Sequence, residues 1–162
     1  MDGSQQFCTF SLDGKLFGVP VPQVQEVIRF QEMTRVPLAP HVIAGMINLR
    51  GQIVTAIDLR RRLGMRARDE EQKPINVVVR CEDGAVSLLV DEIGDVIEVD
   101  QESFEPPPET MGPAARQVIR GVHKLPGRLL LVLDTERAVE VNGAAAALQT
   151  PRAAGASGGT GD

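Results

Sequence analysis

The chain has 162 residues, of which 43% are hydrophobic and 24% charged, a composition ordinary for a globular protein with a buried core. Its formal net charge of −5 gives no general reason to bind nucleic acid. No apolar run approaches the roughly 18 residues of a membrane-spanning helix, and the N-terminal residues resemble no signal peptide. We therefore expect a soluble cytoplasmic protein without membrane insertion.

The first elements in the chain are expected to be two strands around Asp13-Gly14, because apolar residues alternate on both sides of this strong hairpin signal. Residues 23–30 carry apolar side chains at spacings of three and four, which is compatible with one helical turn or with a bent strand. A proline-bracketed linker at 37–40 follows. Residues 43–58 then predict two strands joined by a turn at Arg50-Gly51.

A short helix is predicted after these strands, with Asp58 as its N-cap and Gly64 ending it. A polar loop leads to strands at 75–81 and 85–90, which flank a second Asp-Gly pair, Asp83-Gly84. A second proline-rich linker begins at residue 106.

Two further strands are predicted within 118–134, around Pro126-Gly127, and Asp134 precedes another helical stretch. The Ala- and Gly-rich residues 143–162 are predicted to be a disordered tail.

The reactive side chains argue against an enzyme. His41, His123, Cys8 and Cys81 lack the spacing of zinc sites, which need about three or four ligands, so no metal or cofactor is predicted. The cysteines are expected to be reduced and buried. The carboxylates of residues 91–95 are interpreted as a solvated turn rather than a catalytic pair. A binding module fits this inventory best.

The sequence repeats itself. Residues 43–63 align without a gap with 119–139, 76 positions later, and the first hairpin aligns with the third at a shift of 70. At a shift of 69, Val24 matches Ile93 and Val27 matches Val96. Short strands in two similar half-chains predict an all-β protein of two β-barrels or sandwiches, packed on a shared apolar seam with a groove between them. The paired structural positions are Gly45 and Gly121, Gly51 and Gly127, Asp58 and Asp134, with Asn48 in the same motif.

Several blocks in order resemble the CheW family. They are Val24-Gln25-Glu26-Val27, Pro37-x-x-Pro40, Gly45-x-Ile47-Asn48-Leu49-Arg50-Gly51, Ile57-Asp58-Leu59, Val90-Asp91-x-Ile93-x-x-Val96, and Gly121-Val-x-Lys-Leu-Pro-Gly-Arg-Leu-Leu-x-Val-Leu-Asp134.

The resemblance implies a fold and a function. CheW-like proteins are pairs of SH3-like five-stranded β-barrels that share a hydrophobic interface, with short helices at the barrel ends. On this basis the CheW-like domain is expected over residues 1–142. Its subdomains are expected at roughly 15–80 and 81–142, with the N-terminal strand crossing between them. The family is non-enzymatic and couples chemoreceptors to the histidine kinase CheA.

The resemblance also implies partners and binding residues. The expected partners are the regulatory domain of a CheA-type kinase and the cytoplasmic tip of a methyl-accepting chemoreceptor, at receptor arrays. Ring contacts between CheW-like chains, or with CheA, are a further implication. The residues implied at the receptor surface are Val24, Glu26, Arg50, Ile75, Ile93 and Val96.

A second hypothesis concerns an arginine cluster made of Arg60, Arg61, Arg62, Arg66 and Arg68. Its plain interpretation is a solvated helix face next to acidic residues. The alternative is a small barrel that binds nucleic acid through these arginines, which the acidic balance and the lack of Tyr and Trp disfavour.

Overall fold

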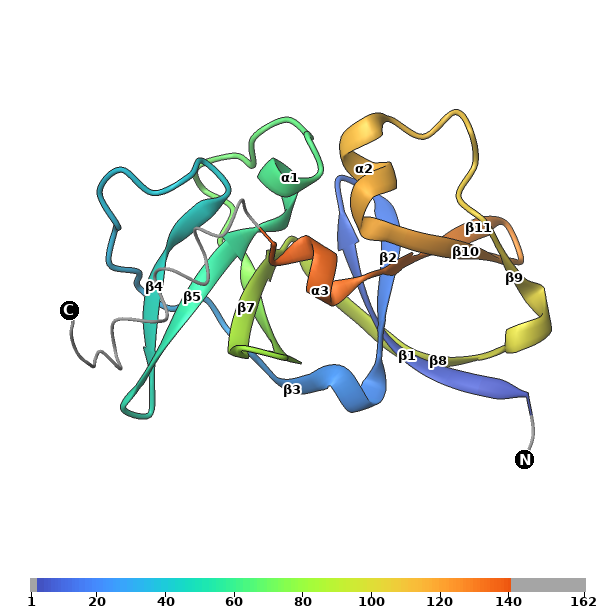
Figure 1. The fold of residues 1–162 in the computed structure, drawn as a ribbon, viewed down its shortest axis with the longest axis horizontal. Coiled ribbons are helices and arrows are strands. Elements are labelled where there is room, and N and C mark those ends of the chain that lie inside the picture. Colours follow the sequence, from blue (N-terminus) through green and yellow to red (C-terminus); the bar gives the residue numbers. More distant parts are fainter. Residues whose placement is uncertain (1–2, 141–162) are drawn as a thin grey trace.

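The computed structural model describes residues 3–140, which form two β-sheets with short helices (Figure 1). The six-stranded sheet has the order β8-β1-β2-β11-β10-β9, and the five-stranded sheet has the order β3-β6-β7-β5-β4. The strands are β1 (Ser4–Leu12), β2 (Lys15–Pro20), β3 (Val24–Ile28), β4 (Ile43–Leu49), β5 (Gln52–Asp58), β6 (Ile75–Cys81), β7 (Gly84–Val90), β8 (Glu92–Asp100), β9 (Phe104–Glu105), β10 (Ile119–Leu125) and β11 (Arg128–Leu133). The helices are α1 (Leu59–Arg62), α2 (Pro113–Val118), α3 (Thr135–Ala138) and the 3-10 turns η1 (Val21–Gln23) and η2 (Gln101–Ser103).

The two halves exchange strands. The hairpin β1–β2 belongs to the six-stranded sheet, after which the chain crosses and forms all five strands from β3 to β7 in the other sheet. It then crosses back and adds β8 to β11 beside the first hairpin. Figure 1 shows the blue N-terminal strands in the same half as the yellow and orange C-terminal ones.

This exchange divides the chain differently from the expected boundary between residues 80 and 81. The five-stranded sheet takes its strands from Val24–Val90, and β2 belongs to the other half. A boundary at 80 would cut the hairpin β6–β7, in which Cys81 pairs with Gly84. The spatial halves and the repeated half-chains are therefore different units.

The internal repeat is confirmed in strand order and at the shifts of 76 and 69, but the first hairpin matches the third at 69 and not at the predicted 70, because Leu12 pairs with Lys15 and Cys81 pairs with Gly84. The order β3-β6-β7-β5-β4 of the five-stranded sheet corresponds, strand for strand, to the order β8-β1-β2-β11-β10 of the other sheet, to which β9 is added. The parallel pair Thr55 and Val86 corresponds to Leu131 and Phe17. A bulge follows Ile43 in β4, and another follows Ile119 at the matching point of β10.

Local turn signals account for the hairpins. Asp13 and Gly14 have φ of 50° and 81°, and Arg50 and Gly51 have φ of 53° and 90°. Two consecutive positive φ values characterise the tight turns whose twist suits a hairpin. Both turns lie where the sequence predicts them, as does the turn that contains Gly127 (φ 77°).

The predicted helix caps are also present. The Asp58 carboxylate accepts a hydrogen bond from the Arg60 backbone N–H, and the Asp134 carboxylate accepts one from that of Arg137. Gly64, with φ of 73°, follows the end of α1. The ambiguous residues 23–30 form β3 after the turn η1.

Three apolar clusters explain the two-part architecture. One lies within the five-stranded sheet and contains Ile47 and Val78. Another lies within the six-stranded sheet and contains Phe7 and Leu130. The largest combines side chains from both sheets, such as Phe17 and Leu88. The predicted all-β fold with a shared hydrophobic interface is thus confirmed. The sheets have six and five strands rather than five each, because β9 extends the first.

Gly45 and Gly121 are structural through close packing rather than through turns. A Cβ atom on Gly45 would lie 2.8 Å from the Thr34 carbonyl oxygen, and one on Gly121 would lie 2.5 Å from that of Glu105. In each half a preceding segment pairs with the strand that carries the glycine, Thr34 with Met46 and β9 with β10, and at the bulge only glycine leaves it room.

Both cysteines are free and half-buried, which makes them less buried than predicted. Burial, with smaller contributions from Glu136 and Asp83, raises the pKa of Cys81 to about 12, so its thiol stays protonated. The predicted tail, residues 143–162, lies outside the described residues.

Candidate partner-binding surface

The first part of the candidate surface is an ion pair between Glu26 and Arg50. Glu26 lies on β3, at one edge of the five-stranded sheet, and Arg50 lies in the β4–β5 turn at the opposite edge. Arg50 Nη1 donates to Glu26 Oε1 at 3.1 Å, and Nη2 donates to Oε2. This two-pronged geometry suits a guanidinium and a carboxylate. The pair therefore brings the two edges of a curled sheet together.

The pair is strongly asymmetric in exposure. The Arg50 side chain is 69% exposed, whereas that of Glu26 is 22% exposed. The hydrogen bonds from Arg50 lower the pKa of the Glu26 carboxyl, which keeps it ionised. Glu26 thus positions a guanidinium whose outer surface stays open to solvent and to a partner.

The turn that carries Arg50 is braced by its own motif. The Asn48 side-chain oxygen accepts a hydrogen bond from the Gly51 backbone N–H at 2.8 Å. Arg50 adopts a positive φ, which is uncommon outside glycine. These features fix the direction in which the chain presents Arg50.

Two of the predicted aliphatic residues are partly structural. Val24 and Ile75 are half-buried and pack against the large shared core. Val24 on β3 pairs with Val79 on β6. Ile75 is the first residue of β6, four residues before Val79, which corresponds to roughly 13 Å along the strand. The structure therefore separates Ile75 from Val24 by most of the length of β6.

The other two predicted aliphatic residues lie on the edge of the second sheet. Ile93 and Val96 belong to β8 and are 40% and 57% exposed. Strands β3 and β8 hold equivalent edge positions and both run along the lower side of the molecule in Figure 1. The predicted residues are therefore divided between two matching edges.

The predicted set omitted two exposed aliphatic residues of the five-stranded sheet. Val27 on β3 is 42% exposed, and Ile53, just after the Arg50 turn, is 53% exposed. The repeat contains the signal for Val27, because the shift of 69 places it on Val96. We define the edge surface as Glu26, Val27, Arg50, Ile93 and Val96.

The arginine cluster is not a solvated helix face. The side chains of Arg60 and Arg68 are each only 7% exposed. Arg60 Nε and Nη2 donate to the two Asp91 carboxylate oxygens at 3.0 and 2.5 Å, and Arg68 Nε donates to the first of them at 2.9 Å. Asp91 is thus a buried ion-pair partner and not part of a solvated turn, whereas its neighbours Glu92 and Asp95 are exposed.

This finding weakens the nucleic-acid hypothesis. Two of the five arginines are neutralised inside the protein. Arg62 donates to the backbone carbonyls of Arg137 and Ala138 at the end of α3. The exposed Arg66 side chain contacts Asp13. A phosphate backbone needs several free cations on one face, and this cluster does not present them.

Asp91 occupies the point where the chain leaves β7 and enters β8. Its carboxylate also accepts the Asp13 backbone N–H at 2.8 Å, from the turn of the opposite sheet. Burial raises the pKa of Asp91, but the hydrogen bonds from Arg60, the Asp13 amide and Arg68 outweigh this effect and hold it at about 2. The network therefore fastens the two sheets to each other.

Residues 3–140 contain no group of three His, Cys, Asp or Glu side chains arranged to hold a metal ion. Among the helices of the same range, none has the length and hydropathy needed to cross a membrane. His123 is buried, its Nδ1 lies 2.7 Å from Ser103 Oγ, and burial lowers its pKa. The edge surface itself offers aliphatic side chains and one positioned cation, which suit non-covalent binding.

Comparison with known proteins agrees with this chemistry. The family model described as a CheW-like domain matches residues 6–142. A probable chemotaxis protein CheW of Rhizobium etli is 31% identical over 83% of this chain and 86% of its own length. The chemotaxis protein CheW of Bacillus subtilis is 31% identical over 84% of this chain and 87% of its own. The crystal structure of the scaffolding protein TtCheW from Thermoanaerobacter tengcongensis superposes with a TM-score of 0.77, at 31% identity, over 86% of this chain and 94% of that one.

The fold and the comparisons define the class as a non-enzymatic scaffolding protein of bacterial chemotaxis. The chain belongs to the CheW family, and the predicted resemblance is confirmed.

Proposed function

We propose that this protein is the adaptor that couples a methyl-accepting chemoreceptor to a CheA-type histidine kinase, within a cytoplasmic receptor array. The edge surface binds the receptor tip. The kinase regulatory domain binds elsewhere on the molecule, and ring contacts with kinase domains or further copies extend the array. Family membership supports the pathway, and the asymmetric Glu26–Arg50 pair is the observation that supports the surface.

The chemistry of the surface fits a helical hairpin with an apolar stripe. Val27, Ile93 and Val96 leave aliphatic area exposed to water, which is removed when an amphipathic helix lies against it. Arg50 retains unused guanidinium protons that can bind a carboxylate or a helix-end carbonyl. Since Glu26 already orients this side chain, little conformational entropy is lost on binding.

Co-sedimentation with a receptor cytoplasmic fragment tests the proposal. We expect Arg50→Ala and Glu26→Lys to weaken receptor binding while the thermal midpoint changes little, because the pair is on the surface. Arg66→Ala is the matched control, since Arg66 is also exposed and also paired with one carboxylate. Equal binding by the Arg50 and Arg66 variants would contradict the assignment. Loss of folding in both edge variants would show that the pair is structural.

A second pair of variants tests the apolar part. Val96→Asp places a charge among the aliphatic residues of the edge surface, and we expect it to abolish receptor binding. Leu129→Asp is its control, because Leu129 is a 39% exposed aliphatic residue on β11, outside the edge surface. Both variants should remain folded, and only the first should lose the receptor.

A further inference from the structure

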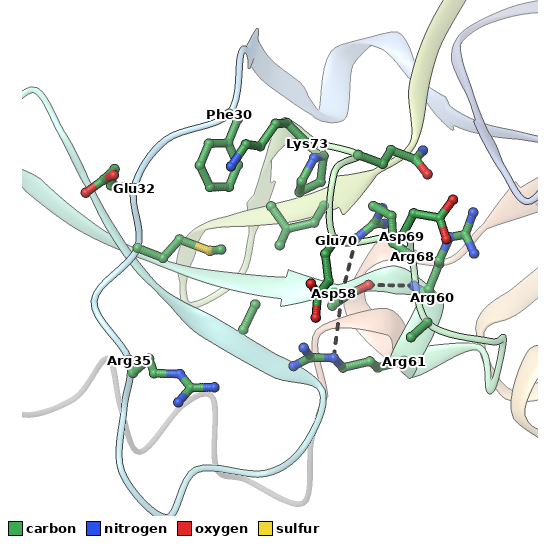
Figure 2. A pocket seen from close by; sticks show the side chains of 16 residues that line it. Phe30, Glu32, Arg35, Asp58, Arg60, Arg61, Arg68, Asp69, Glu70 and Lys73 are labelled. Carbon is green, nitrogen blue, oxygen red and sulfur yellow. Dashed lines mark hydrogen bonds and ion pairs between the residues drawn. The ribbon is translucent and has the colours of Figure 1, made fainter.

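A second candidate binding site lies on the five-stranded half, around the buried arginines. A pocket of about 580 Å³ opens there, between the loop that follows β3 and the loop that follows α1 (Figure 2). Its volume falls within the range of small-molecule sites, about 300–1,000 Å³. Its lining combines apolar groups, such as Phe30 and Leu89, with charged ones.

One polar group in this pocket has an unmet hydrogen-bonding requirement. The Arg68 guanidinium, in a side chain 93% buried, donates from Nε to Asp91 and from Nη1 to Asp58. Its Nη2 is buried and has no hydrogen-bond partner among residues 3–140. A buried donor left unpaired destabilises the folded protein, and it does so more strongly when it is charged. Because Nη2 has almost no surface open to solvent, an acceptor entering from the pocket would have to displace the side chains that cover it, and it would then remove this cost.

The contacts of the other cations in the pocket indicate the charge of an acceptor that would suit Arg68. Arg60 has no spare nitrogen, since Nε and Nη2 bind Asp91 and Nη1 donates to the Arg66 carbonyl. Lys73 lies over the Phe30 ring, 4.9 Å from its centre. Arg61 shares Asp58 with Arg68, so in this corner two guanidinium groups contact one Asp58 carboxylate. The donor left without a partner belongs to a cationic side chain, so an anionic acceptor suits it better than a neutral one.

Acidic residues of the pocket limit the charge of that anion. Glu32, Asp69 and Glu70 also line the pocket, and Figure 2 shows Asp69 and Glu70 close to Arg68 and Asp58, with Glu32 further away. These carboxylates repel a polyanion, whereas a ligand with one anionic group can place it on Arg68 and rest its remainder on the apolar wall.

We propose that this pocket binds the oxyanion group of a small ligand, a carboxylate or a phosphate, with Arg68 Nη2 as the anchoring donor. The site is separate from the edge surface, because none of the five edge-surface residues lines it. A ligand on Arg68 would also affect the ion-pair network between the two sheets, since Arg68 pairs with both Asp91 and Asp58.

Nuclear magnetic resonance titration of the full chain tests this proposal. Amide resonances are followed while sodium butyrate or sodium phosphate is added, with sodium chloride at equal ionic strength as the third arm. We expect saturable shifts at residues 58–61 and 67–73 with butyrate or phosphate, and the arm that saturates first identifies the carboxylate or the phosphate as the preferred group. No saturable shift with either, or identical shifts with chloride, would overturn the proposal.

A matched pair of variants localises the donor. Arg68→Lys keeps the charge and removes the planar fork, and we expect it to weaken binding roughly tenfold or more. Arg66→Lys, on the exposed arginine two residues earlier, should bind as the original chain does. Unchanged affinity in a folded Arg68→Lys variant would overturn the proposal. If this variant does not fold, the titration of the unmodified chain decides alone.

Discussion

Arg60 and Asp91, 31 residues apart, form a buried ion pair with two hydrogen bonds at the point where the chain passes from one sheet to the other. Asp91 simultaneously accepts an amide hydrogen bond from Asp13 in the opposite sheet. One carboxylate therefore connects α1, the crossing segment and the first hairpin. This connection, together with the shared apolar core, holds the two halves that the edge surface spans.

Asp91→Ala should destabilise the protein by about 3–5 kcal/mol, because it leaves two buried guanidinium groups without their shared carboxylate. Urea unfolding measures this cost. Glu92→Ala is the control, since Glu92 is exposed and adjacent in sequence, and it should change stability little. Equal stabilities of the two variants would contradict the structural role of Asp91.

The same carboxylate predicts a dependence of stability on pH. The folded pKa of Asp91 is about 2, below its ordinary value of 3.8. A lowered folded pKa contributes stability that is present above the unfolded pKa and is lost as the pH falls through the folded one. The stability advantage of the original chain over Asp91→Asn should therefore shrink between about pH 4 and pH 2. A constant difference from pH 7 to pH 2 in urea unfolding would refute this.

The two glycines at the strand bulges predict a steric effect. In Gly121→Ala the new methyl group meets the Glu105 carbonyl oxygen and the Phe104 ring, and overpacking of this kind costs about 1–3 kcal/mol. Gly112→Ala is the control, because its Cβ would meet no atom within 4 Å and its φ is −64°. Chemical denaturation should separate the two variants clearly, and similar midpoints would count against the close approach of β9 to β10.

The repeat provides a comparison between equivalent caps. Asp134→Ala removes a helix cap and two long, exposed ion pairs, so a loss of about 1 kcal/mol is expected. Asp58→Ala removes the matching cap and also the partner of buried Arg68, so its cost should be larger, about 3 kcal/mol. If thermal unfolding ranks the two variants in the opposite order, the buried network does not stabilise the fold as described.

The sequence predicted those features that depend on neighbouring residues. Asp13-Gly14 and Arg50-Gly51 specify tight turns through their own backbone preferences, and Asp58 caps the helix that begins at the next residue. Alignment of the two half-chains also paired Val27 with Val96, although the significance of Val27 became visible only with its exposure.

The features that the sequence did not reveal depend on distant residues. The exchange of strands between halves follows from which hairpin a strand meets in space, and periodicity carries no information about that. The stretch that contains Arg60 and Arg68 reads as a solvated face, and the ion pairs that these arginines form with Asp91, more than twenty residues away, are not visible in it. In the same way, Ile75 shares the aliphatic character of Val24 but lies at the far end of its strand.

The proposed adaptor must hold a receptor and a kinase at once, and reconstitution with purified partners tests this most directly. The receptor cytoplasmic fragment and a CheA-type kinase are each incubated with this chain, separately and then together, and the complexes are separated by size. We predict a binary complex with each partner and a ternary complex with both, and Arg50→Ala should lose the receptor while retaining the kinase. Mutually exclusive binding of the two partners, or a kinase–receptor complex that forms equally well without this chain, would contradict the account.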